Sequence, residues 1–161
     1  MTPHLTFRSA CPCDLEALAQ LAHRAEPTGW TLRNFQDALK SGYDVLLACS
    51  GEGIVGYSVT MMVVDEAELL EIGVEPERQG QGIGTLLLAA ALARVTERAA
   101  QRVHLEVRAG NVVAQKLYAS AGFTVVGRRK AYYRPLAAGQ EREDALLMTR
   151  LTHPEIVRAP R

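Results

Sequence analysis

The sequence lacks an excess of charge of either sign and lacks a long apolar run. Its 161 residues include 18 lysines and arginines and 18 aspartates and glutamates, so the net charge is +0 and the pI is near 6.9. This balance argues against a general nucleic-acid binder or a membrane-surface binder. No apolar run is long enough to span a bilayer, and Met1–Arg8 lacks the apolar core of a signal peptide. We therefore expect a cytoplasmic protein with neither a membrane nor a nucleic acid as partner.

Cysteine is scarce, and metal-ligand patterns are missing. The chain has three cysteines, an odd count, and two of them form Cys11-Pro12-Cys13. The histidines are scattered without ligand spacing, at His4, His23, His104 and His153. We expect no metal site, and the natural compartment is the reducing cytoplasm.

The chain shows no repeat, linker or low-complexity segment, and 48% of its residues are hydrophobic. That content is ample for the core of one globular α/β domain, expected over residues 1–152 with a frayed tail over 153–161. Apolar periodicity and turn residues predict the elements in between. In chain order they are a strand at Leu5–Arg8, helices at Asp14–Ala25 and from Thr31 to Gly42, strands at Asp44–Cys49, Ile54–Val64 and Leu69–Val74, a helix at Leu86–Arg98, a strand at Arg102–Val107, a helix at Asn111–Ser120, and strands at Phe123–Arg129 and Ala145–Leu151.

The most informative segment is Gln79-Gly80-Gln81-Gly82-Ile83-Gly84-Thr85, between an expected strand and an expected helix. Pro76 ends the strand, because proline cannot donate to a ladder. The alternating glycines leave the backbone uncovered where the helix begins, and unpaired N–H groups converge there with the positive end of the helix dipole. A phosphate-like anion is the expected ligand. A plain glycine-rich turn is the alternative, but it leaves the entropy cost of the glycines unexplained.

Two familiar phosphate-binding motifs do not fit this segment. A P-loop requires a lysine at the helix start, whereas Thr85 follows Gly84 directly, and a dinucleotide fingerprint spaces its glycines as G-x-G-x-x-G rather than G-x-G-x-G. The segment instead resembles Q/R-x-x-G-x-G/A, the pyrophosphate loop of the GCN5-related N-acetyltransferases (GNAT). Gln79, Gly82 and Gly84 stand in its defining positions.

The resemblance covers nearly the whole chain. The expected order of elements is that of the GNAT acyl-CoA N-acyltransferase fold, a central mixed sheet of about seven strands flanked by about four helices. Several segments resemble the bacterial ribosomal-protein-alanine N-acetyltransferase (RimI) type, namely Asp65–Ala67, Leu105–Asn111, Leu117-Tyr118, Ala121–Phe123, Tyr132-Tyr133 and Glu143–Ala145. The chain departs from its relatives at Gly80, often an arginine, and over Arg134–Arg142, where a peptide substrate would approach.

The resemblance implies acetyl-CoA as cosubstrate. The backbone N–H groups of Gly80–Thr85 would hold the pyrophosphate, together with Gln79 of the motif. The pantetheine arm would lie beside Ile72-Gly73-Val74, and a glycine inside a strand often marks such a close approach. Asn111 would contact the cosubstrate, and it is also a good helix N-cap.

Glu106 is the candidate general base. Strand alternation puts Leu105 and Val107 on one face and Glu106 on the other. A carboxylate in a central strand needs a pocket, a partner or water. The alternative is a glutamate paired with Arg108 or Arg102 at a sheet edge, and the family resemblance favours catalysis.

Glu71 is the rival base, because many acetyltransferases use a carboxylate on that earlier strand. Alternation predicts that its neighbours Leu70 and Ile72 face the other side. In the RimI type this position need not be acidic, so Glu71 ranks second. Tyr118 is the candidate general acid, since its pKa of about 10 lies above that of a thiol at about 8.5 and it can re-protonate the departing sulfur. The alternative is a packing tyrosine beside Leu117 and Phe123.

By resemblance, the leading hypothesis is acetyl transfer to a protein N-terminal amine, the alanine at the start of a small-subunit ribosomal protein. Such an amine has a pKa of about 8, so roughly a tenth is neutral near pH 7 and the base has only to remove a proton through a positioned water. Two alternatives stay open. The acceptor could be a small amine or a lysine side chain, as the acidic cluster Asp65, Glu66, Glu68 and Glu71 allows, or the chain could be a non-catalytic acetyl-CoA-binding module.

Overall fold

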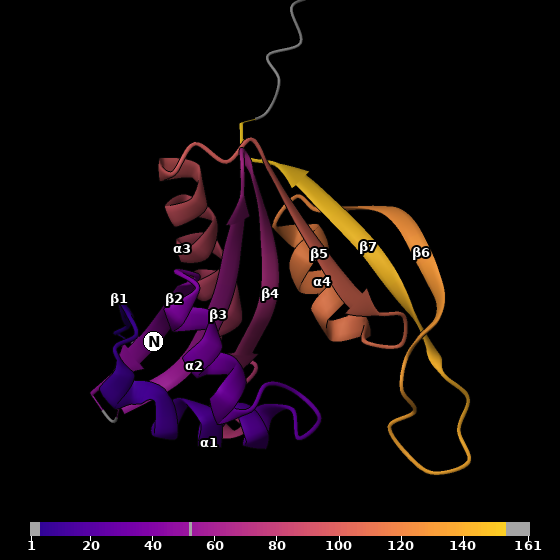
Figure 1. Cartoon of the computed structure of the whole chain (residues 1–161), viewed down its shortest axis with the longest axis horizontal. Coiled ribbons are helices and arrows are strands. Elements are labelled where there is room, and N and C mark those ends of the chain that lie inside the picture. Colours follow the sequence, from indigo (N-terminus) through magenta and orange to yellow (C-terminus); the bar gives the residue numbers. More distant parts are fainter. Residues whose placement is uncertain (1–3, 52, 154–161) are drawn as a thin grey trace, which may run out of the picture.

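The computed structural model describes residues 4–51 and 53–153. In these ranges the chain forms seven strands and four α-helices, in the predicted order (Figure 1). None of the described helices combines the length and the apolar character needed to cross a membrane. The elements are β1 (Thr6–Ser9), α1 (Leu15–Ala25), α2 (Leu32–Lys40), β2 (Asp44–Ser50), β3 (Gly53–Val63), β4 (Glu66–Val74), α3 (Ile83–Glu97), β5 (Arg102–Arg108), α4 (Val112–Ser120), β6 (Thr124–Tyr133) and β7 (Glu143–Leu151), with short 3-10 helices at Pro12–Asp14 and Pro76–Arg78.

The strands form one mixed sheet in the order β1-β2-β3-β4-β5-β7-β6. Neighbouring strands run antiparallel, except β4 and β5, which run parallel. The β4–β5 ladder ends where Leu69 lies opposite Leu105, although β4 continues to Val74 and β5 to Arg108. Beyond the ladder the two strands diverge, as Figure 1 shows. The sheet is therefore split in its middle at one end.

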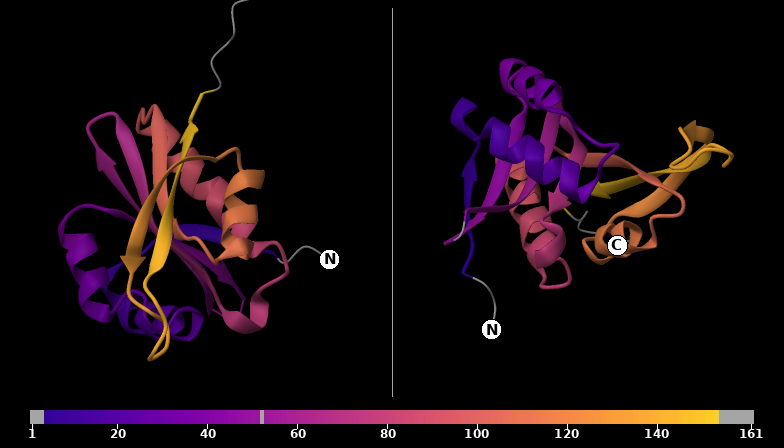
Figure 2. Two further views of the ribbon diagram at one scale, coloured as in Figure 1. Left: turned by 90° about the vertical axis from the view of Figure 1, so that its right-hand side faces the viewer. Right: turned by 90° about the horizontal axis from the view of Figure 1, so that it is seen from below.

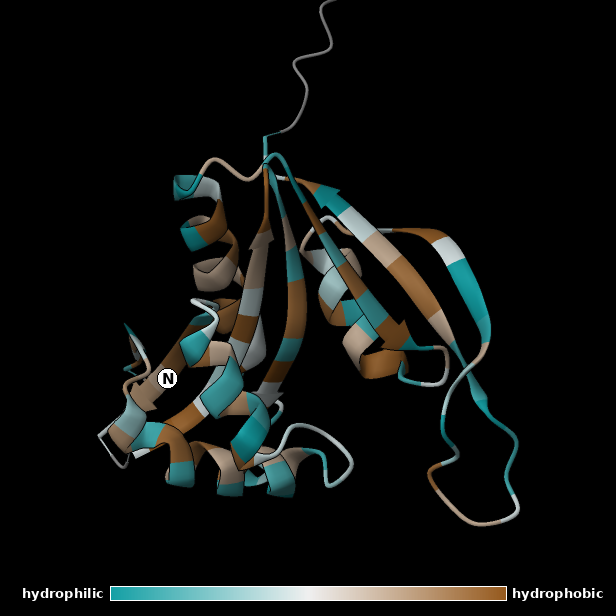
Figure 3. Cartoon of the chain, in the orientation of Figure 1, coloured by the Kyte–Doolittle hydropathy of each residue, from teal (hydrophilic) through white to brown (hydrophobic). Residues whose placement is uncertain are grey.

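Helices cover both faces of the sheet (Figure 2). On one face, α1 and α2 enclose a core cluster that includes Phe35 and Tyr57. On the other face, α3 and α4 pack on further clusters around Leu87 and Leu105. Figure 3 shows that α3 is apolar over most of its length, whereas α1 and α2 alternate between polar and apolar residues. α3 thus contributes buried residues to both clusters on its face of the sheet.

A register shift changes the alternation of β4. In the β3–β4 ladder the pairing passes from Leu69 to Glu71, so Leu70 is an extra residue, a β-bulge. Leu70 therefore packs against the core cluster under α1 and α2. Tyr57 belongs to the same cluster, and its hydroxyl donates a hydrogen bond to Glu71. Ile72 packs with the clusters of α3. The expectation that Leu70 and Ile72 share the face opposite Glu71 is thus wrong for Leu70.

The end of β6 also differs from expectation. Tyr132 and Tyr133 belong to this strand rather than to the following loop, because Tyr133 pairs with Glu143 of β7 and so lengthens the ladder. The remaining strand and helix ends lie within a few residues of their predicted positions. Of the expected tail, residues 154–161 lie outside the described part of the chain.

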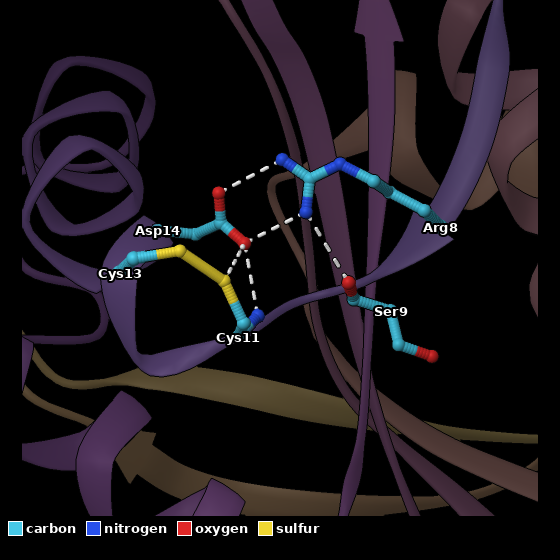
Figure 4. A network of polar contacts seen from close by, with 5 residues as sticks. All are labelled: Arg8, Ser9, Cys11, Cys13 and Asp14. Carbon is cyan, nitrogen blue, oxygen red and sulfur yellow. Dashed lines mark hydrogen bonds and ion pairs between the residues drawn. A yellow bond between two sulfur atoms is a disulfide. The ribbon is translucent and has the colours of Figure 1, made fainter.

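The segment between β1 and α1 holds a small polar network (Figure 4). A disulfide joins Cys11 and Cys13, in place of the reduced thiols that the expected compartment implies. Asp14 accepts two hydrogen bonds from the Arg8 guanidinium, at 2.7 and 2.8 Å, and one from the Cys11 N–H, at 2.8 Å. Arg8 thereby lowers the pKa of Asp14 to about 2. Within the described ranges, Cys11, Cys13 and Asp14 are also the one group spaced like metal ligands, and these atoms are already engaged with one another and with Arg8.

An ion pair joins α3 to the start of β2. Arg94 donates to both carboxylate oxygens of Asp44, each at 2.7 Å, and the Asp44 side chain is 5% exposed. Arg94→Ala leaves this buried carboxylate without its partner, so the free energy of unfolding in a urea titration should fall by about 3 kcal/mol. Arg33→Ala is the control, because it removes an exposed contact with Asp37 at 4.0 Å and should cost less than about 0.5 kcal/mol. Equal losses in the two variants would contradict the prediction.

Candidate active site

The divergence of β4 and β5 opens a cleft of about 910 Å³, a volume typical of small-molecule sites. Its walls come from the loop after α1, from β4, from the glycine loop and the start of α3, and from β5, α4 and the end of β6. Every residue that the sequence predicts for cosubstrate binding or catalysis lines this cleft, with the exception of Gln81. The Gln81 side chain instead accepts a hydrogen bond from Arg78 Nε, at 3.1 Å.

The glycine loop presents open backbone at one end of the cleft. Gly80 and Gly82 have φ values of 76° and 82°, in the region that favours glycine, and no described atom beyond their chain neighbours lies within 4 Å of where their Cβ atoms would be. Gly82 is the N-cap of α3, and no described side chain caps this helix. The N–H groups of its first turn are therefore available to an anion. Gln79 supports the loop by donating to the Val74 carbonyl, at 3.2 Å.

The end of β4 has a backbone edge without a strand partner. Ile72–Val74 pair with β3 on one side, but on the other side no described strand pairs with them, because the β4–β5 ladder stops at Leu69. An extended pantetheine arm could pair with this edge like an added strand. Gly73 also serves the packing of the core, since a Cβ at this position would lie 2.6 Å from the ring of Tyr57.

Glu71 lies deep in the wall of the cleft. Burial raises the pKa of Glu71 to about 7, against an ordinary value of 4.5. The Tyr57 hydroxyl, which donates to Oε2 at 3.3 Å, opposes this rise, and the charge of Glu26 adds to it. Glu71 therefore titrates near neutral pH and is able to accept a proton there.

Glu106 faces the cleft from β5. The predicted alternation is confirmed, since Leu105 and Val107 are buried while Glu106 is partly exposed. Its Oε1 lies 3.4 Å from Arg129 Nη2 on β6, and its side chain is 23% exposed. The charge of Glu106 raises the pKa of Tyr132, which lies beside it at the end of β6. Glu106 thus stands among an arginine, a tyrosine and solvent.

The structural alternative for Glu106 is wrong in the arginine that it names. Glu106 lies on a strand between β4 and β7, just beyond the end of the β4–β5 ladder at Leu105. Its partner is Arg129, whereas Arg108 pairs with Glu143 at 3.5 Å.

Tyr118 and Asn111 each have a structural task as well as a place in the cleft. Tyr118 is 7% exposed, and its ring packs edge-on against Phe123 with centroids 5.9 Å apart. Burial, followed by the charge of Glu71, raises the pKa of Tyr118, which keeps its hydroxyl protonated. Asn111 caps α4, with its Oδ1 accepting the Ala114 N–H at 3.1 Å. The packing and capping roles considered from the sequence are thus present, and both residues line the cleft.

The sequence did not indicate a further group around Arg108. Its guanidinium lies 4.4 Å from the centroid of the Tyr133 ring and donates to the Arg134 carbonyl at 3.3 Å. Glu143 pairs with Arg108 and accepts the Gly110 N–H at 2.7 Å. These contacts fasten the loop after β6 to the segment before α4. No local pattern pairs residues that are so far apart in the chain.

Residues 13–123, which include the glycine loop, Glu106 and Tyr118, match the sequence model of the acetyltransferase (GNAT) family. The chain belongs to the GNAT family. A curated relative from Salmonella typhimurium, named ribosomal protein bS18-alanine N-acetyltransferase, is 35% identical over 135 residues, which cover 84% of this chain and 89% of the relative. The protein is therefore an enzyme of the acetyltransferase class, similar to a GNAT member over most of its length.

Solved GNAT structures share the fold. The crystal structure of the ribosomal-protein-S18-alanine N-acetyltransferase from Escherichia coli has a TM-score of 0.86 and 29% identity, and the match covers 98% of this chain and 100% of that one. A putative acetyltransferase from Salmonella typhimurium, solved with its cofactor acetyl-CoA, has a TM-score of 0.75 and 20% identity, with 98% of both chains covered. The fold predicted from the resemblance is confirmed.

The raised pKa of Glu71 makes stability depend on pH. The Glu71 carboxyl binds its proton more tightly in the folded state than in the unfolded state. Protonated Glu71 therefore stabilises the fold fully below pH 4.5, and this contribution is lost as the pH rises through 7. Relative to Glu71→Gln, the wild-type free energy of unfolding should therefore fall by about 3 kcal/mol between roughly pH 4 and pH 8. Urea titrations at several pH values measure it, and Glu97→Gln, at an exposed position of α3, is the control. A difference that does not change with pH would contradict the burial of Glu71.

Proposed function

We propose that the protein transfers an acetyl group from acetyl-CoA to the N-terminal amine of a protein, the N-terminal alanine of a small-subunit ribosomal protein. The observation that carries the proposal is a single cleft that is lined both by the glycine loop and by carboxylates and tyrosines. The names of relatives that are similar over most of the chain supply the acceptor.

The cosubstrate is held by backbone groups. Acetyl-CoA supplies the acetyl thioester, and its pyrophosphate fits the open N–H groups of Gly80–Thr85 at the positive end of the α3 dipole. The free edge at Ile72–Val74 pairs with the pantetheine arm, and an N–H of this edge is placed to polarise the thioester oxygen. Asn111 contacts the cosubstrate from the start of α4.

Glu106 and Tyr118 carry the proton transfers of a direct attack. Glu106 removes a proton from the acceptor amine through a positioned water, a modest demand for an amine whose pKa is about 8. Tyr118, kept protonated by its burial, returns a proton to the leaving sulfur. Glu71 is the alternative base, because its raised pKa suits a proton acceptor near neutral pH.

A peptide that begins with alanine should be acetylated on its α-amine, with release of coenzyme A, because the cleft offers the acceptor a base and a route to the thioester. Mass spectrometry of the peptide and a thiol assay measure the two products. Two further acceptors are compared with this peptide. One is the same peptide with a blocked N-terminus and an internal lysine, and the other is a polyamine. No turnover of any amine-bearing peptide by folded protein that binds acetyl-CoA would contradict the proposal. Turnover restricted to the polyamine would favour the small-amine alternative, which the carboxylates of Glu68 and Glu71 in the cleft support.

Glu106→Gln and Tyr118→Phe should each lower kcat by roughly 10²-fold or more, because each removes one partner in proton transfer. The Kd of acetyl-CoA, measured by calorimetry, should stay within about twofold of the wild-type value, because neither side chain is proposed to bind the cosubstrate. Tyr43→Phe, outside the cleft, is the control. Unchanged turnover in both variants would instead support a non-catalytic binding module.

Gly82→Ala should weaken acetyl-CoA binding about tenfold, because the new methyl group enters the space that the phosphates occupy and strains a backbone with φ of 82°. Gly42→Ala is a matched control, since Gly42 has φ of 77° and no described atom within 4 Å of its Cβ position, but lies outside the cleft. If both variants bind acetyl-CoA equally well, the glycine loop is not the pyrophosphate site.

A further inference from the structure

Tyr57 is a residue of the core whose hydroxyl reaches the cleft. It is 1% exposed, and its ring packs edge-on against Phe35 with centroids 5.4 Å apart. In the β3–β4 ladder Tyr57 lies opposite Gly73, and its ring occupies the place where a side chain at 73 would stand. The absence of that side chain lets the ring lie over the backbone of β4 and carry its hydroxyl to Glu71, at 3.3 Å from Oε2.

The surroundings of Glu71 show why this contact matters. Glu26 acts on it from the end of α1, and Tyr118 of α4 and Tyr133 of β6 both experience its charge. Tyr57 is the neighbour that donates a hydrogen bond to it, and a donor stabilises the ionised form of a carboxylate. The contact therefore keeps Glu71 ready to accept a proton in a setting where burial favours the protonated form.

The proton balance of the reaction allows a second proton acceptor in the cleft. A protonated amine loses two protons when it becomes an amide, and the sulfur of coenzyme A gains one as it leaves, so one proton is released to solvent. About a tenth of the amine is neutral near pH 7 and has already lost its first proton to solvent. For an amine that binds as ammonium, with Glu106 as the acceptor for one proton of the nitrogen, the other proton can go to a second acceptor in the same cleft. Glu71 lines that cleft from the opposite strand.

We propose that Tyr57 is a positioning residue for acetyl transfer, which reaches over Gly73 and holds the Glu71 carboxylate in the cleft wall so that it takes the first proton from the acceptor ammonium. The O–H bond of Glu71 forms as the N–H bond breaks, and the proton then passes to solvent. The proposal rests on the proposed function for its acceptor amine. The alternative is that Tyr57 is a packing residue only.

Tyr57→Phe tests the proposal, because it keeps the ring against Gly73 and Phe35 and removes only the donor. In protein without substrate, a ¹³C NMR titration of labelled glutamate carboxyls, with the Glu71 signal assigned through Glu71→Gln, should show the Glu71 midpoint rising by roughly half to one pH unit. The acidic limb of kcat/KM for the alanine-starting peptide should move upward by the same amount. The KM for acetyl-CoA should not change.

The control is Tyr43→Phe, the same substitution at a tyrosine that packs against the same core cluster and does not line the cleft. It should leave both the titration and the acidic limb unchanged. In a Glu71→Gln background, Tyr57→Phe should have no further effect on the acidic limb. Gly73→Ala should reproduce the rise of the Glu71 midpoint, because its methyl group would displace the tyrosine ring.

Each outcome decides a separate question. An unchanged Glu71 titration in Tyr57→Phe overturns the positioning role. A shifted titration with an unmoved acidic limb shows that Glu71 does not serve turnover and also overturns the proposal. If the wild-type protein acetylates no amine while the titration shifts, the proposed function fails and the contact between Tyr57 and Glu71 stands.

Discussion

The site depends on the point at which β4 and β5 part. Their ladder ends at Leu69 and Leu105, so the backbone groups beyond it face a cleft and not a neighbouring strand. A continuous parallel ladder would satisfy the same groups and close the site. This one interruption leaves the edge at Ile72–Val74 without a strand partner on that side and brings side chains of two strands to opposite walls of one cavity.

The polar groups of the cleft are held by the core and not by mobile loops. Tyr57 is part of an apolar cluster, Tyr118 packs against Phe123, and Asn111 caps the helix that it begins. Because each residue also has a structural task, its polar atom stays in place without a substrate. The same burial that fixes Glu71 raises its pKa, so positioning and proton affinity have one cause.

Local patterns predicted the element order and the glycine loop, since each depends on residues close together in the chain. The bulge at Leu70 could not be predicted in this way, because it depends on the register between β3 and β4. The pairing of Glu106 with Arg129 likewise joins β5 to β6, two strands separated by β7 in the sheet. The two cysteines of Cys11-Pro12-Cys13 lie close together in the sequence, but that pattern did not indicate that they form a disulfide.

The sequence by itself determined an anion site, because the glycines of Gln79–Thr85 and the helix after them expose backbone N–H groups through a geometry that neighbouring residues alone dictate. Only the tertiary structure decided the surroundings of Glu71 and Glu106. Whether Glu71 is buried, whether Tyr57 reaches it over Gly73, and which strand faces Glu106 are set by strand register and packing. Those properties arise when distant segments exclude water together, and no single segment contains them.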